Sequence, residues 1–238
     1  MPGTILDMHI HTTNGASDSQ LAPDELAEGA ARIGMTGVNV TEHDRVWDRY
    51  VLDAYRQKHA PFFVNAGMEV STDLGHVLAV GLKEYVPGIR RADELRRALD
   101  AVGGFMIVAH PFRHWFDPVT FRRLGKEPPE MTAEKMAQLP IFSLVDAIEV
   151  LNGANTLREN RFALEVAEYL GKPGTGGSDA HSTSGIGYYT TVFEHDLQSS
   201  EEMLAELHAR RFYPALGLAE GRLRRFTLGD LESEVPAR

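Results

Sequence analysis

The segment Asp7-Met8-His9-Ile10-His11 constrains this chain more than any other. It lies in a stretch from Thr4 to His11 in which apolar and polar residues alternate, and this alternation predicts a β-strand with Asp7, His9 and His11 on one face. Two imidazoles at positions i and i+2 can bind one metal ion, and a nearby carboxylate can hold an imidazole in place. A polar strand face with two incidental histidines is the alternative. Further residues of metal-ligating types elsewhere in the chain are needed to favour a metal site.

The composition excludes several classes of site. None of the 238 residues is cysteine, which excludes disulfides, cysteine-based zinc sites and a cysteine nucleophile. A formal net charge of -10 argues against a broad nucleic-acid-binding surface, so we expect no binding to duplex nucleic acid. No apolar run approaches the length of a membrane span, and the first strand begins within a few residues of Met1. We therefore expect a cytoplasmic protein that makes no membrane contact.

Strands and helices alternate along most of the chain. After the first strand, the pattern predicts strands at 37–41, 61–70, 76–80, 105–109, 146–151, 174–177 and 212–218, and helices at 23–33, 46–59, 91–102, 158–170 and 200–211. This alternation predicts mostly parallel strands with helices outside them. Roughly seven strands in a chain of this length favour an α/β barrel over a doubly wound open sheet.

Residues of metal-ligating types follow the ends of these predicted strands. Parallel strands bring their carboxyl ends to one rim, where barrel enzymes place their chemistry. Carboxylates and imidazoles gathered there would repel one another or stay unpaired unless cations lay between them. The candidate metal ligands are His9, His11, Asp18, His43, Glu69, His76, His110, Asp179 and His181.

In these motifs the chain resembles the polymerase and histidinol phosphatase (PHP) family of metal-dependent phosphoesterases. The motifs, in the order of the family, are Asp7-Met-His-Ile-His11, Ser17-Asp18, Thr41-Glu-His-Asp44, Gly67-Met-Glu69, His76, Ala109-His-Pro111 and Ser178-Asp-Ala-His181. The resemblance implies one domain over residues 1–238, built as a distorted (β/α)7 barrel with its metal site at the C-terminal rim of the strands. Glu42 departs from the pattern, because relatives usually carry aspartate there, and we expect it to support the site without binding an ion.

Carried over residue by residue, the resemblance implies two to three divalent ions. His9, His11, Glu69 and Asp179 would hold the first. Glu69 would bridge to a second, which His76 and His110 complete. Asp18, His43 and His181 would hold the third, and Asp7 and Asp44 would orient ligand imidazoles. Nitrogen and oxygen ligands suit Mn, Zn or Fe, and ligand softness does not choose among them.

The charge of such a site suits phosphate esters. Three ions, three ligand carboxylates and one bridging hydroxide leave the site at about +2, which a phosphomonoester dianion balances. We therefore expect a hydrolase, either a phosphatase or a phosphodiesterase, that cleaves small phosphomonoesters, nucleotides or short oligonucleotides with a metal-bridging hydroxide. Two alternatives stay open: a metal-dependent hydrolase of a non-phosphate ester, amide or carbamate, and a non-catalytic metal-binding module. The complete ligand set argues against the second.

Arg113 is the predicted phosphate contact, because it follows His110 closely and a guanidinium can fork onto two oxygens. Its replacement by alanine is expected to impair turnover and to leave the metal content unchanged. Asn152 and Arg158 are further candidates, although a surface turn and a helix-start salt bridge explain them equally well.

Residues 113–140 fit no simple α/β unit. They leave from the predicted catalytic rim, which favours a lid in which Trp115 or Phe116 covers the substrate. The alternative is an insertion packed on the outside by Trp115 and Phe121. Beyond about residue 230 we expect a loosely held tail.

Overall fold

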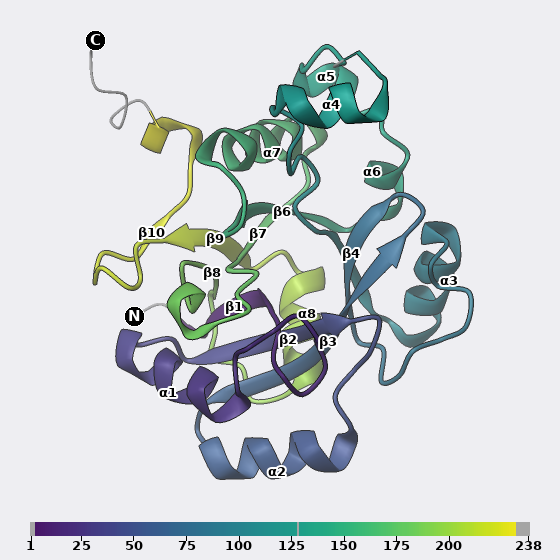
Figure 1. The fold of residues 1–238 in the computed structure, drawn as a ribbon. Helices are drawn as coiled ribbons and strands as arrows, with labels where there is room; N and C mark the ends of the chain where they lie inside the picture. Colours follow the sequence, from purple (N-terminus) through teal and green to yellow (C-terminus); the bar gives the residue numbers. More distant parts are fainter. Residues whose placement is uncertain (1–2, 128, 232–238) are drawn as a thin grey trace.

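A mixed ten-stranded sheet organises residues 3–127 and 129–231, the part of the chain that the computed structural model describes (Figure 1). The strands follow one another across the sheet in the order β10-β9-β8-β1-β2-β3-β4-β5-β6-β7. Their bounds are β1 (Ile5–Ile10), β2 (Gly37–His43), β3 (Phe63–Thr72), β4 (Gly75–Val80), β5 (Phe105–Val108), β6 (Ala147–Asn152), β7 (Gly174–Gly177), β8 (Tyr189–Phe193), β9 (Phe212–Leu216) and β10 (Arg224–Arg225).

The sheet curls until the end of β7 meets β1. Just past β7, the Asp179 amide donates to the His9 carbonyl at 2.7 Å, and the His11 amide donates to the Ala180 carbonyl at 3.1 Å. A short parallel bridge joins Ile10 to Ala180. The two ends of the chain's metal-ligating motifs, about 170 residues apart in sequence, are thereby brought side by side.

The prediction of mostly parallel strands is wrong. The pairs β1–β2, β2–β3, β5–β6 and β6–β7 are parallel, but β4 is antiparallel to both of its neighbours, and β8, β9 and β10 pair antiparallel as well. The two residues between β3 and β4 are too few for the crossover that parallel pairing needs. The strand β8, which the sequence analysis missed, adds to β1. A curled α/β sheet is therefore confirmed, without a strict sevenfold repeat of strand and helix among the described residues.

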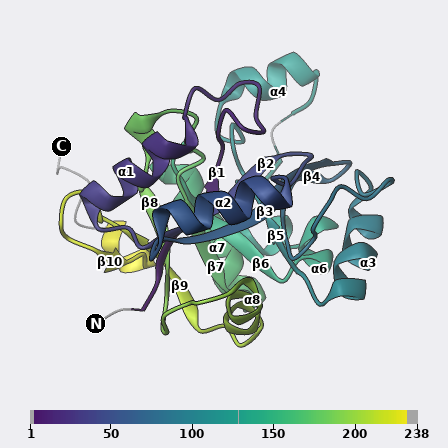
Figure 2. The same ribbon diagram turned by 90° about the horizontal axis from the view of Figure 1, so that it is seen from below.

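Helices cover the sheet, and local signals define several of them. Their bounds are α1 (Pro23–Ile33), α2 (Arg49–His59), α3 (Ala92–Val102), α4 (Pro118–Leu124), α5 (Ala133–Met136), α6 (Ile141–Leu144), α7 (Leu157–Leu170) and α8 (Ser200–His208), with 3-10 turns at Thr183–Gly185 and Leu228–Leu231. Helix α7 begins at a capping box made by Thr156 and Glu159 and ends at Gly171, whose φ is 64°. Helices α1 and α2 lie side by side over β1–β3, and α4 and α8 lie at opposite ends of the molecule (Figure 2).

The segment 113–140 packs against α7. The Trp115 ring lies edge-on to Phe112 and Phe121, with centroids 5.7 and 6.1 Å away, and the Phe116 ring meets Phe162 of α7 at 5.4 Å. Figure 1 shows α4 and α5 stacked outside α7. This packing agrees with the outer-insertion alternative, and the lid stays a prediction. Most of the predicted tail, residues 232–238, lies outside the described residues.

Apolar side chains from both faces of the sheet fill the core, including Met8 and Ile10 beneath the histidines of β1. None of the helices in the described part of the chain has the length and apolar character that a membrane crossing requires.

Candidate metal centre

The imidazoles of His9 and His11 meet at the C-terminal end of β1. Both side chains are fully buried, and their Nε2 atoms lie 3.1 Å apart. Both Nε2 atoms also lie 3.3–3.5 Å from Asp179 Oδ1 and from Glu69 Oε2. Two nitrogens and two carboxylate oxygens thus converge on one point, as the lone pairs of metal ligands do.

Glu69 lies between two groups of imidazoles. Its Oε1 accepts hydrogen bonds from His76 Nδ1 at 2.8 Å and from His110 Nε2 at 3.1 Å. Its Oε2 faces His43 Nδ1 at 2.9 Å as well as the two histidines of β1. Parallel pairing of β2 with β3 places His43 directly opposite Glu69, which explains how residues 26 positions apart come together. This position is the one that a bridging carboxylate needs.

His43, His181 and Asp18 form a more exposed group. Asp18 Oδ2 lies 3.4 Å from His43 Nε2 and 3.5 Å from His181 Nε2. The Asp18 side chain is 59% exposed, and the two imidazoles are about one-third exposed. Both rings stack on the His11 ring, with centroids 4.2 and 4.4 Å away. This group therefore borders the buried one through His11.

The structure brings the predicted ligands together. Among the residues that the structure describes, side-chain atoms within 4.8 Å of one another form four groups: His9, His11 and Asp179; Glu69, His76 and His110; His11, His43 and His181; and His9, His110 and Glu149. All the predicted ligands except Asp18 belong to one of these groups. Glu149 is a member that the sequence analysis did not identify.

The donor set fits divalent cations. Glu69 Oε2 is buried and has no aligned hydrogen bond among the described residues, although three imidazole nitrogens lie within 3.4 Å of it. A buried carboxylate oxygen in this state is costly unless a cation satisfies it. The residues that are present therefore match the metal-binding chemistry that the motifs predict.

Electrostatics around His9 point the same way. Burial by itself lowers the pKa of the His9 imidazole, but the charges of Asp179, Glu149 and Glu69 outweigh burial and raise the pKa well above 6.5. For the carboxyl groups of Glu69 and Asp179, burial by itself raises the pKa. The neighbouring imidazoles, and Arg113 beside Asp179, outweigh burial and bring both pKa values far below the usual range. The carboxylates thus draw positive charge into the site, which protons can supply and metal ions would supply better.

Left-handed backbone is concentrated here. Asp44, His110 and Asp179 have φ values of 50°, 30° and 54°, a region that side-chain-bearing residues rarely adopt. Such strain persists where the surroundings enforce it, and it clusters at functional sites.

Arg113 and Asn152 reach the site, whereas Arg158 points elsewhere. Arg113 Nη2 forms an ion pair with Asp179 Oδ2 and donates to Asn152 Oδ1 at 2.7 Å, and its Nε donates to Asn155 Oδ1 at 3.2 Å. The exposed Arg158 guanidinium lies 4.1 Å above the centre of the Phe116 ring. Asn155 was not predicted from the sequence.

The family model PHP_C, described as PHP-associated, matches residues 158–212. A two-domain protein from Bacteroides vulgatus containing a predicted PHP-like metal-dependent phosphoesterase shares the fold, with 20% identity and a TM-score of 0.60 over 90% of this chain and 64% of that one. The family model covers 55 of the 238 residues, and at 20% identity the solved structure establishes the fold alone. Both findings agree with the resemblance seen in the motifs.

Two further structures are similar to this chain. PsfC from Pseudomonas syringae PB-5123 is 19% identical, with a TM-score of 0.62 over 92% of this chain and 95% of that one. An amidohydrolase from Chromobacterium violaceum, solved with bound sulfate and no metal, is 18% identical, with a TM-score of 0.55 over 87% of this chain and 96% of that one. At these identities the likeness establishes the fold alone. No curated protein sequence matches the chain.

The two carboxylates predicted to orient ligand imidazoles, Asp7 and Asp44, have other partners in the structure. Asp7 Oδ1 accepts from the amides of His9 and Ser178, at 3.2 and 2.8 Å, so it joins β1 to the end of β7. Asp44 accepts from the Ser71 amide at 3.2 Å and from Arg90 Nη2 at 2.6 Å. Among the described residues, neither carboxylate hydrogen-bonds to a ligand imidazole; Asp7 accepts from backbone amides, and Asp44 accepts from a backbone amide and from Arg90.

Glu42 supports the loop that carries Asp18. It is fully buried and accepts hydrogen bonds from the Thr12 hydroxyl at 2.5 Å and from Trp47 Nε1 at 2.7 Å. It makes no hydrogen bond or ion pair with a predicted ligand in the described part of the chain. Its expected role as a supporting residue is consistent with these contacts.

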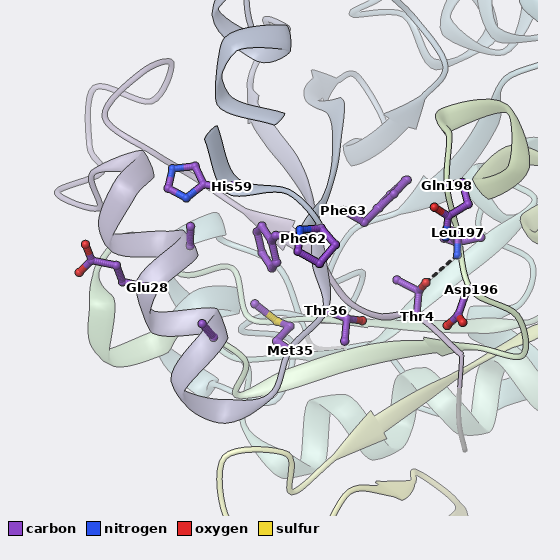
Figure 3. A pocket seen from close by; sticks show the side chains of 13 residues that line it. Thr4, Glu28, Met35, Thr36, His59, Phe62, Phe63, Asp196, Leu197 and Gln198 are labelled. Atoms are coloured by element: carbon purple, nitrogen blue, oxygen red, sulfur yellow. Dashed lines mark hydrogen bonds between the residues drawn. The ribbon is translucent and has the colours of Figure 1, made fainter. Parts of the chain in front are cut away.

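A cavity of about 540 Å³ lies at the other end of the parallel strands (Figure 3). Its lining includes Thr4, Thr36 and Phe63, which precede or begin β1, β2 and β3, together with Met35 and Phe62. No predicted ligand lines it. Glu28, His59 and Asp196 also line it, but none of them belongs to a group of potential metal ligands among the described residues. We therefore assign the chemistry to the histidine cluster and not to this cavity.

Proposed function

We propose that this protein is a metal-dependent phosphoesterase of the PHP type that acts on small phosphorylated substrates. One observation carries the proposal: the buried imidazoles and carboxylates around His9, His11, Glu69 and Asp179 stand directly beside the guanidinium of Arg113. A cation-binding cluster beside an arginine is the combination that a phosphoryl group requires.

We propose three ion positions within the cluster. His9, His11, Glu69 and Asp179 would hold the first ion, and Glu69, His76 and His110 the second. His43, His181 and Asp18 would hold the third. Most of these side chains come from the carboxyl ends of strands or from the turns after them, as the barrel-rim hypothesis requires. His76 comes from the amino end of β4, which reaches the same rim because β4 is antiparallel to its neighbours. Mn, Zn and Fe all suit this set of nitrogen and oxygen donors.

When bound, such ions supply a water of lowered pKa and neutralise charge on the phosphoryl oxygens. The chain itself supplies orientation. Arg113 Nη1 has no hydrogen-bond partner among the described residues, so it can donate to a phosphoryl oxygen while Nη2 and Nε stay bonded to Asp179, Asn152 and Asn155. The two asparagines hold the guanidinium plane, which lowers the entropy lost when substrate binds. Arg158 has no proposed contact with substrate.

A second candidate is a metal-dependent hydrolase of an amide, a carbamate or a non-phosphate ester. The shared fold of the Chromobacterium violaceum amidohydrolase favours it. The positive charge of Arg113 beside the cluster favours phosphate instead, because a neutral acyl substrate gains less from it. The non-catalytic alternative predicts the loss of ligands, and every predicted ligand lies in the cluster or at its border.

One experiment separates the candidates. The protein is purified without chelator, its metal content is measured, and the same sample is assayed against panels of phosphomonoesters, nucleotides, amides and carboxylic esters. A His9→Ala variant shows whether any activity belongs to this site, and duplex DNA serves as a negative substrate because of the net charge of -10. Phosphate-ester hydrolysis that chelator abolishes and Mn restores supports the proposal. Amide or carboxylic-ester hydrolysis without phosphate-ester hydrolysis supports the second candidate.

A further inference from the structure

Glu149 places a carboxylate in the middle of a fully buried strand whose other residues are apolar, apart from Asn152 at its end. Its side chain is 0% exposed, and β6 has Ile148 and Val150 on either side of it. A buried carboxylate is costly unless several donors satisfy it. The partners of its two oxygens therefore indicate what it does.

Glu149 Oε1 selects the tautomer of His9. The distance from Oε1 to His9 Nδ1 is 3.0 Å. An ionised carboxylate only accepts hydrogen bonds, so Nδ1 has to carry the proton. In the neutral form that a metal ligand takes, the ring then presents the lone pair of Nε2 to the point shared with His11, Glu69 and Asp179.

Glu149 Oε2 holds a second part of the cluster. It accepts from the backbone amide of His110 at 2.8 Å and from Asn152 Nδ2 at 3.0 Å. The first bond fixes the left-handed backbone of His110, whose imidazole contacts Glu69. The second fixes the amide orientation of Asn152, so that its Oδ1 faces Arg113. Contacts thus run from His9 through Glu149, Asn152 and Arg113 to Asp179, and back to His9.

We infer that Glu149 is a positioning residue of the metal centre, which sets the tautomer of His9 and the backbone of His110 and thereby the affinity for the first two ions. The inference rests on the metal centre of the proposed function, but not on the identity of the hydrolysed bond. The motifs did not reveal it, because its partners lie 140, 39 and 3 residues away in the chain.

The test measures metal affinity in Glu149→Gln. The variant keeps the size of the side chain, but an amide cannot accept through both of its ends. Zinc affinity of the purified chain is measured by competition with a chromophoric chelator. We expect about 10–100-fold weaker binding, the usual effect of removing a partner of a metal ligand. Glu159→Gln is the matched control, because Glu159 is also buried and accepts from the backbone amides of His114 and Thr156, away from the cluster.

A second readout reports the tautomer directly. In the zinc-loaded wild type, the His9 Nδ1 proton should give a protected NMR signal that Glu149→Gln shifts or loses and Glu159→Gln keeps. Should Glu149→Gln fail to fold, Glu149→Asp carries the test. It keeps the charge but shortens the side chain. A positioning role therefore predicts weaker zinc binding, whereas a purely electrostatic role predicts unchanged zinc binding.

Wild-type zinc affinity together with an unchanged Nδ1 signal in Glu149→Gln overturns the inference. A wild-type protein that binds zinc tightly but hydrolyses no phosphate ester refutes the proposed activity and leaves the inference standing on the affinity data. A wild-type protein that binds no metal refutes both.

Discussion

Arg113 and Asp179 form an ion pair through Arg113 Nη2 and Asp179 Oδ2, while Asp179 Oδ1 faces the imidazoles of His9 and His11. The residue expected to bind phosphate therefore also orients a proposed metal ligand. Because Arg113 contacts a proposed metal ligand, its replacement should affect metal binding as well as substrate binding.

Replacing Arg113 by alanine should lower metal content as well as activity. The sequence alone predicted an unchanged metal content, but the contact with Asp179 alters that expectation. We expect a higher KM for phosphate substrates and about 10-fold weaker metal binding, as for the loss of other partners of metal ligands. Arg161→Ala, which removes an exposed helical ion pair, is the control. Unchanged metal affinity in Arg113→Ala would restrict its role to substrate.

Replacing Glu69 by glutamine removes a charge from between two groups of imidazoles. Activity should fall by more than the roughly 100-fold upper range for partners of ligands, since Glu69 is a proposed bridging ligand. Metal content should fall with it, and circular dichroism should show a retained fold because the core is apolar elsewhere. Wild-type turnover in this variant would refute the bridge.

The protein purified without chelator should hold roughly two to three metal ions per chain, following the known multinuclear hydrolases. Asp18→Ala should remove about one of them, because the ion pairs of Asp18 within the described part of the chain are with His43 and His181 of the exposed group. Elemental analysis of both proteins checks the count. Loss of every ion from Asp18→Ala would show that the positions do not fill independently.

Gly177 lies against the backbone of β1. A Cβ at this position would lie 2.5 Å from His9 Cβ and 2.7 Å from the His9 amide nitrogen, so Gly177→Ala has to displace β1 or β7. We expect lower thermal stability and weaker metal binding together. In Gly29→Ala the new methyl comes close to the flexible end of the Ile186 side chain, at 2.5 Å, and none of its nearest contacts is a backbone atom of another segment, so both quantities should change little. Thermal unfolding and chelator competition measure them.

Glu206 should make stability depend on acid pH. The hydrogen bond from Arg211, together with His195, lowers the pKa of Glu206 from 4.5 to about 2. Because the folded pKa lies below the unfolded one, the contribution is complete above about pH 4.5 and is lost as the pH falls towards 2. At pH 7 the metal-free wild type should have a higher denaturant concentration at its unfolding midpoint than Glu206→Gln. This difference in midpoint should shrink as the pH falls from 4.5 to 2. A difference independent of pH would exclude this ion pair as its cause.

Much of the fold follows from local patterns. The helix at 23–33 is confirmed to the residue, and the one at 158–170 begins one residue earlier in the structure, because proline, a capping box and C-terminal glycines act within a single turn. The orientation of β4 and the existence of β8 depended on pairing across the sheet, which periodicity does not encode. The short connection from β3 to β4 was the available signal for the first of these.

The predicted metal ligands could be named from the sequence, because the alternation in β1 and the spacing of the motifs are local properties. Which carboxylate hydrogen-bonds to which imidazole became visible in the folded structure. Glu149, 140 residues from His9, takes the contact expected of Asp7 or Asp44, and Arg113 takes Asp179 as its partner. Those pairings depend on how β6 and β7 close against β1. A charged residue inside an apolar strand signals that a partner exists, but the identity of that partner is set by the packing of distant strands.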